Sequence, residues 1–143
     1  MSLFVVDASV AVKWFLPAIS ETLTDEASTW LARYTKKEVN FLVPDLFWVE
    51  CASVACKAIR RGRLTKVSAD AALTALTQYD FPTIPTVNLL RKAFEIAAKY
   101  ERTVYDSVYV ALAVQTNSQL ITADETLANS LAALFPVKWL GSM

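Results

Sequence analysis

Residues 3–10, LFVVDASV, decide the fold, because four apolar residues end on a single acid, Asp7, and residues suited to a helix start follow. An apolar run at residues 3–6 is typical of a buried strand. Similar runs occur at residues 39–43, 81–84, 119–122 and 137–140, and segments with helical periodicity separate them. This alternation predicts an α/β fold, with a parallel sheet of about five strands between two layers of helices.

Two of the expected helices have recognisable features. One begins at Asp45, after Pro44, and ends at Gly62, which suits the position that terminates a helix. The other follows Thr86 and carries an apolar stripe at helical spacing, which is expected to pack on the sheet. The stripe consists of Val87, Leu90, Phe94 and Ala97.

The composition excludes several classes of protein. A chain of 143 residues is long enough for one domain, expected to span residues 1–143. Its 14 basic and 14 acidic residues cancel, so it lacks the overall basic charge of many nucleic-acid-binding proteins. Histidine is absent, which removes Ser-His-Asp triads and the common zinc ligand sets.

Hydrophobic residues make up 55% of the chain, which indicates that some apolar surface serves a partner and favours a homo-oligomer. No apolar stretch approaches the roughly 20 residues that a bilayer-spanning helix needs. We therefore expect a cytoplasmic protein with no membrane segment. Cys51 and Cys56 match no zinc or redox spacing and are expected to be buried thiols.

Three acids lie where helices are expected to begin. Asp7 follows the first strand, Asp106 is the last residue of the capping-box pattern TVYD, and TADE repeats that pattern around Asp124. Each acid taken alone is explained as part of a helix cap. In a parallel sheet, however, the carboxyl ends of the strands and the first turns of the helices meet at one edge, where ligands bind. The three acids together therefore favour a site.

Glu50 is harder to explain as a cap. It lies within LFWVECASVA, where an ionised carboxylate, if buried, costs several kcal/mol unless it has a partner. The basic residues on the same helix, Lys57, Arg60 and Arg61, lie beyond the i,i+4 spacing. Asp106, within TVYDSVYVALAV, likewise has no obvious basic partner.

Several carboxylates without a base raise one another's pKa unless a metal ion neutralises them. An all-oxygen ligand set suits Mg²⁺ or Mn²⁺ rather than zinc, and such an ion activates water against a phosphodiester without histidine. Ser9 and Thr122 stand beside the acids. They are explained either as helix caps or as hydroxyls that orient a carboxylate or the metal-bound water.

Four motifs, VVDASV, VPDLFWVECASV, TVYDSVYVALAV and LITADETLANSL, resemble the PIN-domain ribonucleases, and among them the VapC-type toxins of toxin–antitoxin pairs. The resemblance runs over nearly the whole chain and implies a three-layer PIN-like fold that cleaves single-stranded RNA with Mg²⁺ or Mn²⁺. It places the catalytic, metal-binding acids at Asp7, Glu50, Asp106 and Asp124, supported by Ser9 and Thr122. Departures occur at Ser53 and Ser107, where members often have Asn and Ala.

The resemblance also implies a homodimer and a cognate antitoxin protein as partners. The densest group of basic residues has two interpretations: it is a solvated helix end, or it contacts the phosphates of the RNA. It comprises Lys57, Arg60, Arg61, Arg63 and Lys66. Two further acids, Asp45 and Glu125, are expected to be helix caps.

Two other functions remain open at this point. Magnesium-dependent phosphoryl transfer through aspartate also places an acid at the end of a strand. Haloacid-dehalogenase-like phosphatases need a second Asp where this chain has Ser9, and response-regulator receivers need an acidic pair where Asp7 is alone. The second alternative is a catalytically silent PIN-like binding module, in which the acids only cap helices.

Overall fold

The computed structural model describes residues 2–17 and 21–142. Within them, five strands form one parallel sheet in the order β3-β2-β1-β4-β5, which confirms the predicted α/β fold. The strands are β1 (Ser2–Val6), β2 (Val39–Pro44), β3 (Thr83–Ile84), β4 (Gln119–Thr122) and β5 (Val137–Trp139). The third strand is shorter than the expected 81–84, because Pro82 has no N–H to donate to a neighbour.

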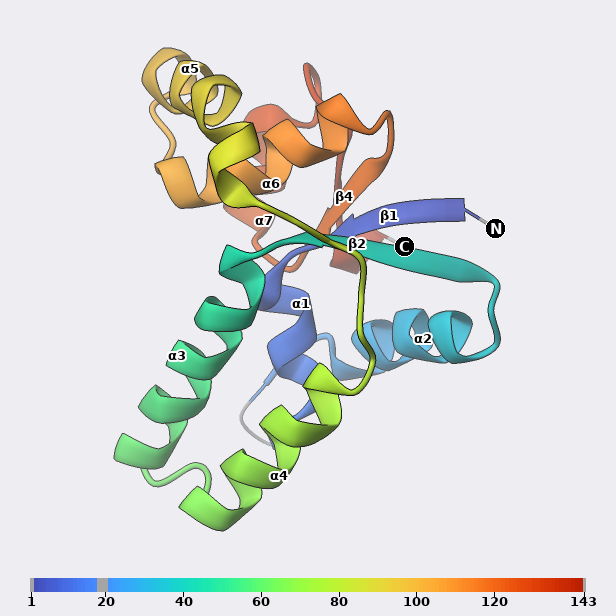
Figure 1. Ribbon diagram of the computed structural model, residues 1–143, viewed down its shortest axis with the longest axis vertical. Helices are drawn as coiled ribbons and strands as arrows, with labels where there is room; N and C mark the ends of the chain where they lie inside the picture. Colours follow the sequence, from blue (N-terminus) through green and yellow to red (C-terminus); the bar gives the residue numbers. More distant parts are fainter. Residues whose placement is uncertain (1, 18–20, 143) are drawn as a thin grey trace.

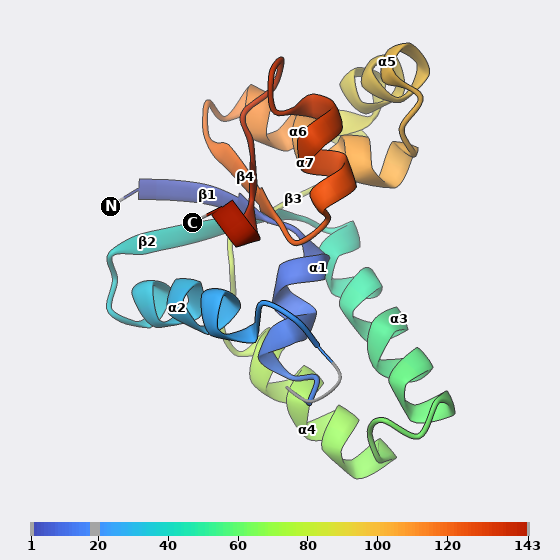
Figure 2. The same cartoon turned by 180° about the vertical axis from the view of Figure 1, so that it is seen from behind.

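Helices cover both faces of the sheet (Figures 1 and 2). On one face lie α1 (Ala8–Ala11), α2 (Thr24–Thr35), α3 (Leu46–Arg60) and α4 (Lys66–Thr77). On the other lie α5 (Leu90–Tyr100), α6 (Val104–Gln115) and α7 (Glu125–Leu131). Short 3₁₀ turns are η1 (Val12–Trp14), η3 (Thr86–Leu89) and η4 (Leu140–Ser142). In the described part of the chain, no helix is both long and apolar enough to cross a bilayer.

The strand order reverses around β1, which pairs with β2 on one side and with β4 on the other. The β1–β4 pairing continues one residue beyond β1, where the Asp7 N–H donates to the Ile121 carbonyl at 3.1 Å. Such a reversal leaves a crevice beyond the carboxyl ends of the two strands, because their connections leave in opposite directions. Asp7 and Asp124 follow these two strand ends.

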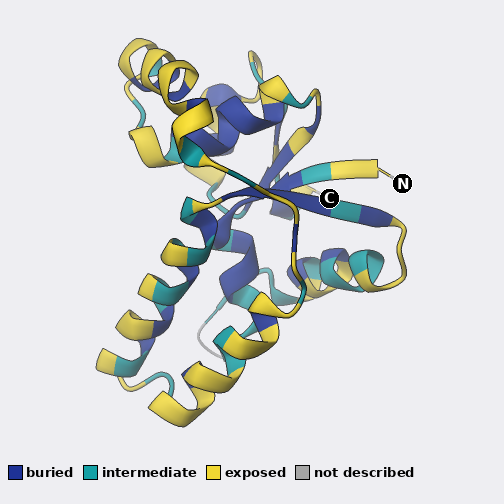
Figure 3. Ribbon diagram, in the orientation of Figure 1, coloured by how far each residue is buried: buried dark blue, intermediate teal, exposed yellow. Residues whose placement is uncertain are grey.

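The core runs along the sheet and through α6 (Figure 3). Residues 107–113 of α6 are all buried, because this helix lies between the sheet and α5. A helix in that position is apolar on every side. Asp106, one residue before the buried run, therefore lies at the edge of the core rather than on a solvated helix face.

The expectation that the stripe of Val87, Leu90, Phe94 and Ala97 packs on the sheet is wrong. Val87, Leu90 and Phe94 are exposed. The buried residues are Leu89 of η3 and Ala93, Ile96 and Ala97 of α5, and α5 packs against α6. Both sets have helical spacing, so periodicity alone does not choose between them. The small side chains of Ala93 and Ala97 permit the close approach to α6, which leaves an apolar surface uncovered.

The end of α3 agrees with its sequence signals. Gly62 has φ +72°, and its N–H donates to the Ile59 carbonyl at 3.1 Å, as in a glycine-terminated helix. The expectation of two buried thiols is correct for Cys51 and wrong for Cys56, which is exposed. Five residues on a helix turn the second side chain to the far side of the first, so only one of them can face the core.

Candidate active site

The four acids singled out in the sequence line one cavity of about 270 Å³ beyond the carboxyl ends of the strands. Asp7 follows β1, Asp124 follows β4, Glu50 enters from the second turn of α3, and Asp106 enters from the first turn of α6. We call this space the acid cavity. Its lining consists of Asp7, Ala8, Ser9, Glu50, Ser53, Val54, Lys57, Asp106 and Asp124.

A network of hydroxyl groups holds the Asp7 carboxylate. Thr122 Oγ1 donates to Asp7 Oδ2 at 2.8 Å, and Ser9 Oγ donates to the same oxygen at 3.0 Å. Each hydroxyl also accepts a backbone N–H, from Asp124 to Thr122 and from Ala123 to Ser9, both at 3.0 Å. Burial raises the pKa of the Asp7 carboxyl, and the hydrogen bonds from Thr122 and Ser9 offset part of that rise.

Helix capping is also present at these positions. Asp7 caps α1 by accepting the Ser9 N–H at 3.4 Å, and Asp124 caps α7 by accepting the Leu127 N–H at 3.1 Å. At α6 the cap is Thr103, whose hydroxyl accepts the Asp106 N–H at 3.1 Å. A carboxylate has enough lone pairs to accept a cap bond and still face the cavity, so capping and lining coexist.

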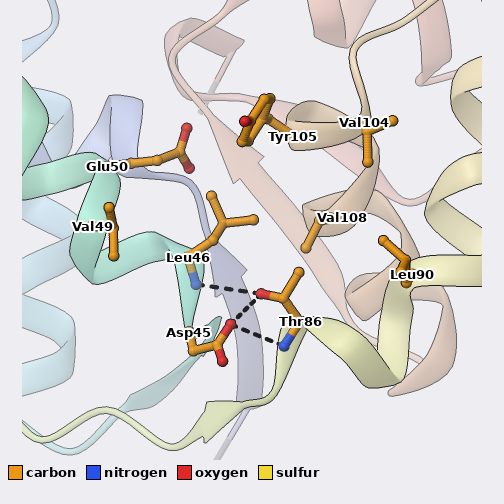
Figure 4. A pocket seen from close by; sticks show the side chains of 9 residues that line it. All are labelled: Asp45, Leu46, Val49, Glu50, Thr86, Leu90, Val104, Tyr105 and Val108. Carbon is orange, nitrogen blue, oxygen red and sulfur yellow. Dashed lines mark hydrogen bonds between the residues drawn. The ribbon is translucent and has the colours of Figure 1, made fainter.

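The other two acids lie outside the lining of the acid cavity. Asp45 precedes α3, but its carboxylate makes no cap bond there, so the cap interpretation is wrong for its side chain. It accepts from the N–H of Thr86 at 2.9 Å and from the Thr86 hydroxyl, which ties η3 to the start of α3 (Figure 4). Glu125 is exposed in the first turn of α7, where its negative charge interacts favourably with the helix dipole.

Glu50 has a neutral partner that the sequence did not indicate. The Tyr109 hydroxyl, on a side chain only 2% exposed, donates to Glu50 Oε1 at 2.5 Å. Burial is the main cause that raises the pKa of Glu50 to about 7; the Tyr109 bond opposes this rise, and the charges of Asp7 and Asp106 add to it. The one sequence signal for Tyr109 is its place a helical turn after Asp106.

The expectation that Asp106 lacks a basic partner is wrong. Arg102 Nη2 lies 3.4 Å from Asp106 Oδ2, one helical turn earlier in the chain. Of the predicted basic group, Lys57 lines the acid cavity, whereas Arg60 and Arg61 are exposed farther along the end of α3. Arg63 pairs with Glu21 at 2.8 Å, and Glu21 also pairs with Lys13 at 3.1 Å.

The donor chemistry of the acid cavity fits a hard divalent cation, because its four carboxylates offer only oxygen. Burial raises the pKa of Asp7 and Glu50, and the charges of neighbouring acids add to the rise, so a cation would favour the ionised forms of both carboxyls. Among residues 2–17 and 21–142, however, no three Cys, Asp or Glu side chains are grouped tightly enough to enclose an ion as they stand. The acids thus line the cavity without converging on one point.

A larger cavity of about 670 Å³ also has Glu50 in its lining (Figure 4). Glu50 lines both spaces, so they share a wall. The larger one is apolar, with Tyr105 and Leu90 across from Val49. Tyr105 is 67% exposed, whereas Tyr109 is buried and Trp14 is half-buried against Phe41, so of these three aromatic residues only Tyr105 is free to stack on a ligand.

The model of the PIN-domain family matches residues 4–130, a span that contains all four acids. The chain belongs to the PIN-domain family. Ribonuclease VapC3 of Pyrobaculum aerophilum is 32% identical to this PIN domain over 133 residues, which cover 91% of the chain and 95% of that relative. Ribonuclease VapC9 of Mycobacterium tuberculosis is 34% identical over 95 residues, covering 66% of the chain and 73% of that relative.

Solved structures share the fold of this PIN domain at low sequence identity. A crystal structure of a Pyrobaculum aerophilum protein has a TM-score of 0.71 at 19% identity and covers 99% of this chain and 85% of its own. VapBC2 of Rickettsia felis, bound to a promoter DNA fragment, has a TM-score of 0.68 at 11% identity, with coverages of 96% and 98%. VapC20 of Mycobacterium tuberculosis, described as a Sarcin-Ricin loop cleaving toxin, has 0.64 at 18% identity, with coverages of 94% and 96%.

Proposed function

We propose that this PIN domain is a divalent-metal-dependent endoribonuclease and the toxin of a VapBC-type toxin–antitoxin pair. One observation carries the proposal: four carboxylates from distant parts of the chain line one cavity at the strand-order reversal. The similarity to VapC ribonucleases over most of the chain supports the choice of RNA as substrate. RNA and a cognate antitoxin are then its partners, and the cytoplasm is its place of action.

In this proposal Asp7, Glu50, Asp106 and Asp124 hold Mg²⁺ or Mn²⁺. The bound ion supplies a water of lowered pKa and stabilises the charge on the cleaved phosphodiester. The residues of the chain prepare the site. Thr122 and Ser9 fix the orientation of the Asp7 carboxylate, and Tyr109 fixes that of Glu50. Carboxylates that are already held by hydrogen bonds lose less freedom when they converge on the cation.

Lys57 is the proposed first contact to the RNA phosphates, because it is exposed and lines the acid cavity. Arg60 and Arg61 extend the basic group along the end of α3. Arg63, predicted in the same role, already shares Glu21 with Lys13. Its contribution to RNA binding therefore requires exchange of that ion pair.

The test is an RNA cleavage assay on the purified protein with Mg²⁺, with Mn²⁺ and with EDTA, on single-stranded and structured RNAs. Cleavage is expected only with a metal ion. Asp7→Asn should abolish it while leaving the protein folded, and Glu125→Gln, which removes an acid outside the cavity lining, should retain it. Cleavage in EDTA, or a fully active Asp7→Asn protein, refutes the mechanism. Metal binding without cleavage supports the silent binding module instead.

We also propose that the protein forms a homodimer through its exposed apolar surface. This apolar face spans α3, η3, α5 and α6 and comprises Val49, Val87, Leu90, Phe94, Val104 and Tyr105. It combines a protruding side chain, Phe94 at 62% exposure, with the apolar hollow lined by Leu90 and Val49. A surface with both a protruding side chain and a hollow can pair with the same surface of a second copy about a twofold axis.

Light scattering after size exclusion tests the dimer on the full chain. The wild type should have twice the mass of one chain, and Phe94→Asp should be monomeric. Leu134→Asp is the matched control, because Leu134 is 64% exposed but lies outside the apolar face. A monomeric wild-type protein refutes the homodimer and leaves this face to the antitoxin.

A further inference from the structure

Arg102 places a positive charge directly against one of the four acids. It precedes Thr103, the cap of α6, and its Nη2 atom lies 3.4 Å from Asp106 Oδ2. The backbone holds it there: Glu101 ends α5 with φ +55°, and the Arg102 N–H donates to the Ala97 carbonyl at 3.2 Å. The link between α5 and α6 thus fixes the backbone position from which the Arg102 side chain extends.

The contact between Arg102 and Asp106 is long, although both side chains are partly buried. Their side chains are 19% and 31% exposed, and 3.4 Å is long for a charge-assisted hydrogen bond. The Arg102 Nε is buried and has no hydrogen-bond partner in the described structure. A guanidinium carries five N–H donors, so Arg102 has donors beyond the one that Asp106 accepts. A long contact of this kind is one that a stronger partner of Asp106 can displace.

The location of this ion pair distinguishes it from the others in the described residues. The remaining pairs join Lys13 and Arg63 to Glu21, Arg33 to Glu38 and Lys66 to Asp70. None of those acids lines the acid cavity, whereas Asp106 does. A cation bound by Asp106 and the guanidinium of Arg102 would therefore carry charges of the same sign against one carboxylate.

We propose that Arg102 is a positioning residue that competes with the divalent cation for Asp106. It holds Asp106 in the metal-free protein, where no ion balances the carboxylates, and it yields that oxygen when the cation binds. Arg102 therefore lowers the affinity for the cation. This inference rests on the proposed metal-dependent function. It adds a residue, other than the four acids, that sets the affinity for the cation.

The experiment is titration of the metal-free, full-length protein with Mn²⁺ alone, followed by calorimetry. Arg102→Met should tighten Mn²⁺ binding about twofold to fivefold, the upper part of the range expected when a partly exposed charge pair no longer competes. Arg102→Lys, which keeps the charge, should stay close to the wild type. The tightening should shrink in 0.5 M salt, because screening weakens the repulsion between the two cations.

Lys66→Met is the matched control, because it removes the same charge from an exposed i,i+4 pair, 2.8 Å from Asp70. Its Mn²⁺ affinity should equal that of the wild type. A merely structural Arg102 predicts the opposite sign, since losing the anchor of Asp106 would weaken Mn²⁺ binding. If Arg102→Met does not fold, Arg102→Gln replaces it with the same expectation.

The outcomes separate the two proposals. Unchanged or weaker Mn²⁺ binding in the Arg102→Met protein, beside clear binding in the wild type, overturns the role of Arg102 and leaves the ribonuclease proposal standing. A folded wild type that neither binds Mn²⁺ nor cleaves RNA overturns the proposed function and this inference with it.

Discussion

Replacing Glu50 by Gln should stabilise the metal-free protein at alkaline pH. The pKa of Glu50 rises from 4.5 to about 7 in the folded protein, mainly because the carboxyl is buried. The folded state therefore binds its proton more tightly than the unfolded state, and stability falls as pH rises from about 4.5 to about 7. The loss of stability from ionising Glu50 is absent below this window and fully present above it.

A pKa difference of this size corresponds to about 3 kcal/mol for a fully shielded group. Glu50 is partly exposed, so solvent screening reduces the expected gain of Glu50→Gln to roughly 1–2 kcal/mol at pH 8. At pH 5 the gain should be clearly smaller, because pH 5 lies near the lower end of this window: the folded carboxyl is still mostly protonated, and only the unfolded one has begun to ionise. The Tyr109 hydroxyl still finds an acceptor, since the amide oxygen of Gln replaces Oε1.

The assay is urea unfolding in EDTA at pH 5 and pH 8, with Glu125→Gln as a control for losing one negative charge. The control should show no gain at pH 8, because Glu125 is exposed and favourably placed at a helix N-terminus. Adding Mn²⁺ should reverse the order, stabilising the wild type more than Glu50→Gln. A Glu50→Gln protein that is less stable than the wild type at pH 8, or equally changed at both pH values, contradicts the reasoning.

Three further predictions concern single side chains. Thr122→Val removes the fully buried hydroxyl that donates to Asp7, and urea unfolding at pH 8 should show a loss of about 2 kcal/mol; an unchanged stability contradicts the network. Tyr109→Phe should reduce metal-dependent RNA cleavage in a gel assay while the circular dichroism spectrum stays unchanged, because Glu50 loses its one donor among the described contacts. Gly62→Ala should cost about 1 kcal/mol in thermal unfolding, because alanine is strained at φ +72° although the space around it is open.

The positions of the acids were predictable because they depend on local signals. Apolar runs that end on Asp7 and near Asp124 mark the strand ends, and a parallel sheet brings such ends to one edge. Capping and a place in the acid cavity do not exclude each other, since Asp7 and Asp124 cap their helices and also line the cavity. Sequence patterns describe one helix end at a time and do not show that several ends share a cavity.

The contacts that tune the acids could not be predicted. Tyr109 meets Glu50 across two helices that are far apart in the chain, and nothing local to either residue indicates that pairing. Arg102 was within reach of a local rule, since it stands four residues before Asp106, but whether the two side chains turn toward each other depends on the link between α5 and α6.

The sequence by itself determined the alternation of strands and helices, the place of Asp7, Asp106 and Asp124 at one edge, and the oxygen-only chemistry of the acids, because periodicity, turn residues and composition can be read without the tertiary contacts. Only the tertiary structure decided which face of α5 is buried, since two stripes of equal spacing compete and the fit against α6 selects one. It also decided that the Thr122 hydroxyl donates to Asp7, because Thr122 reaches Asp7 only when β4 pairs with β1. Contacts between distant segments depend on packing, and packing is a property of the whole chain.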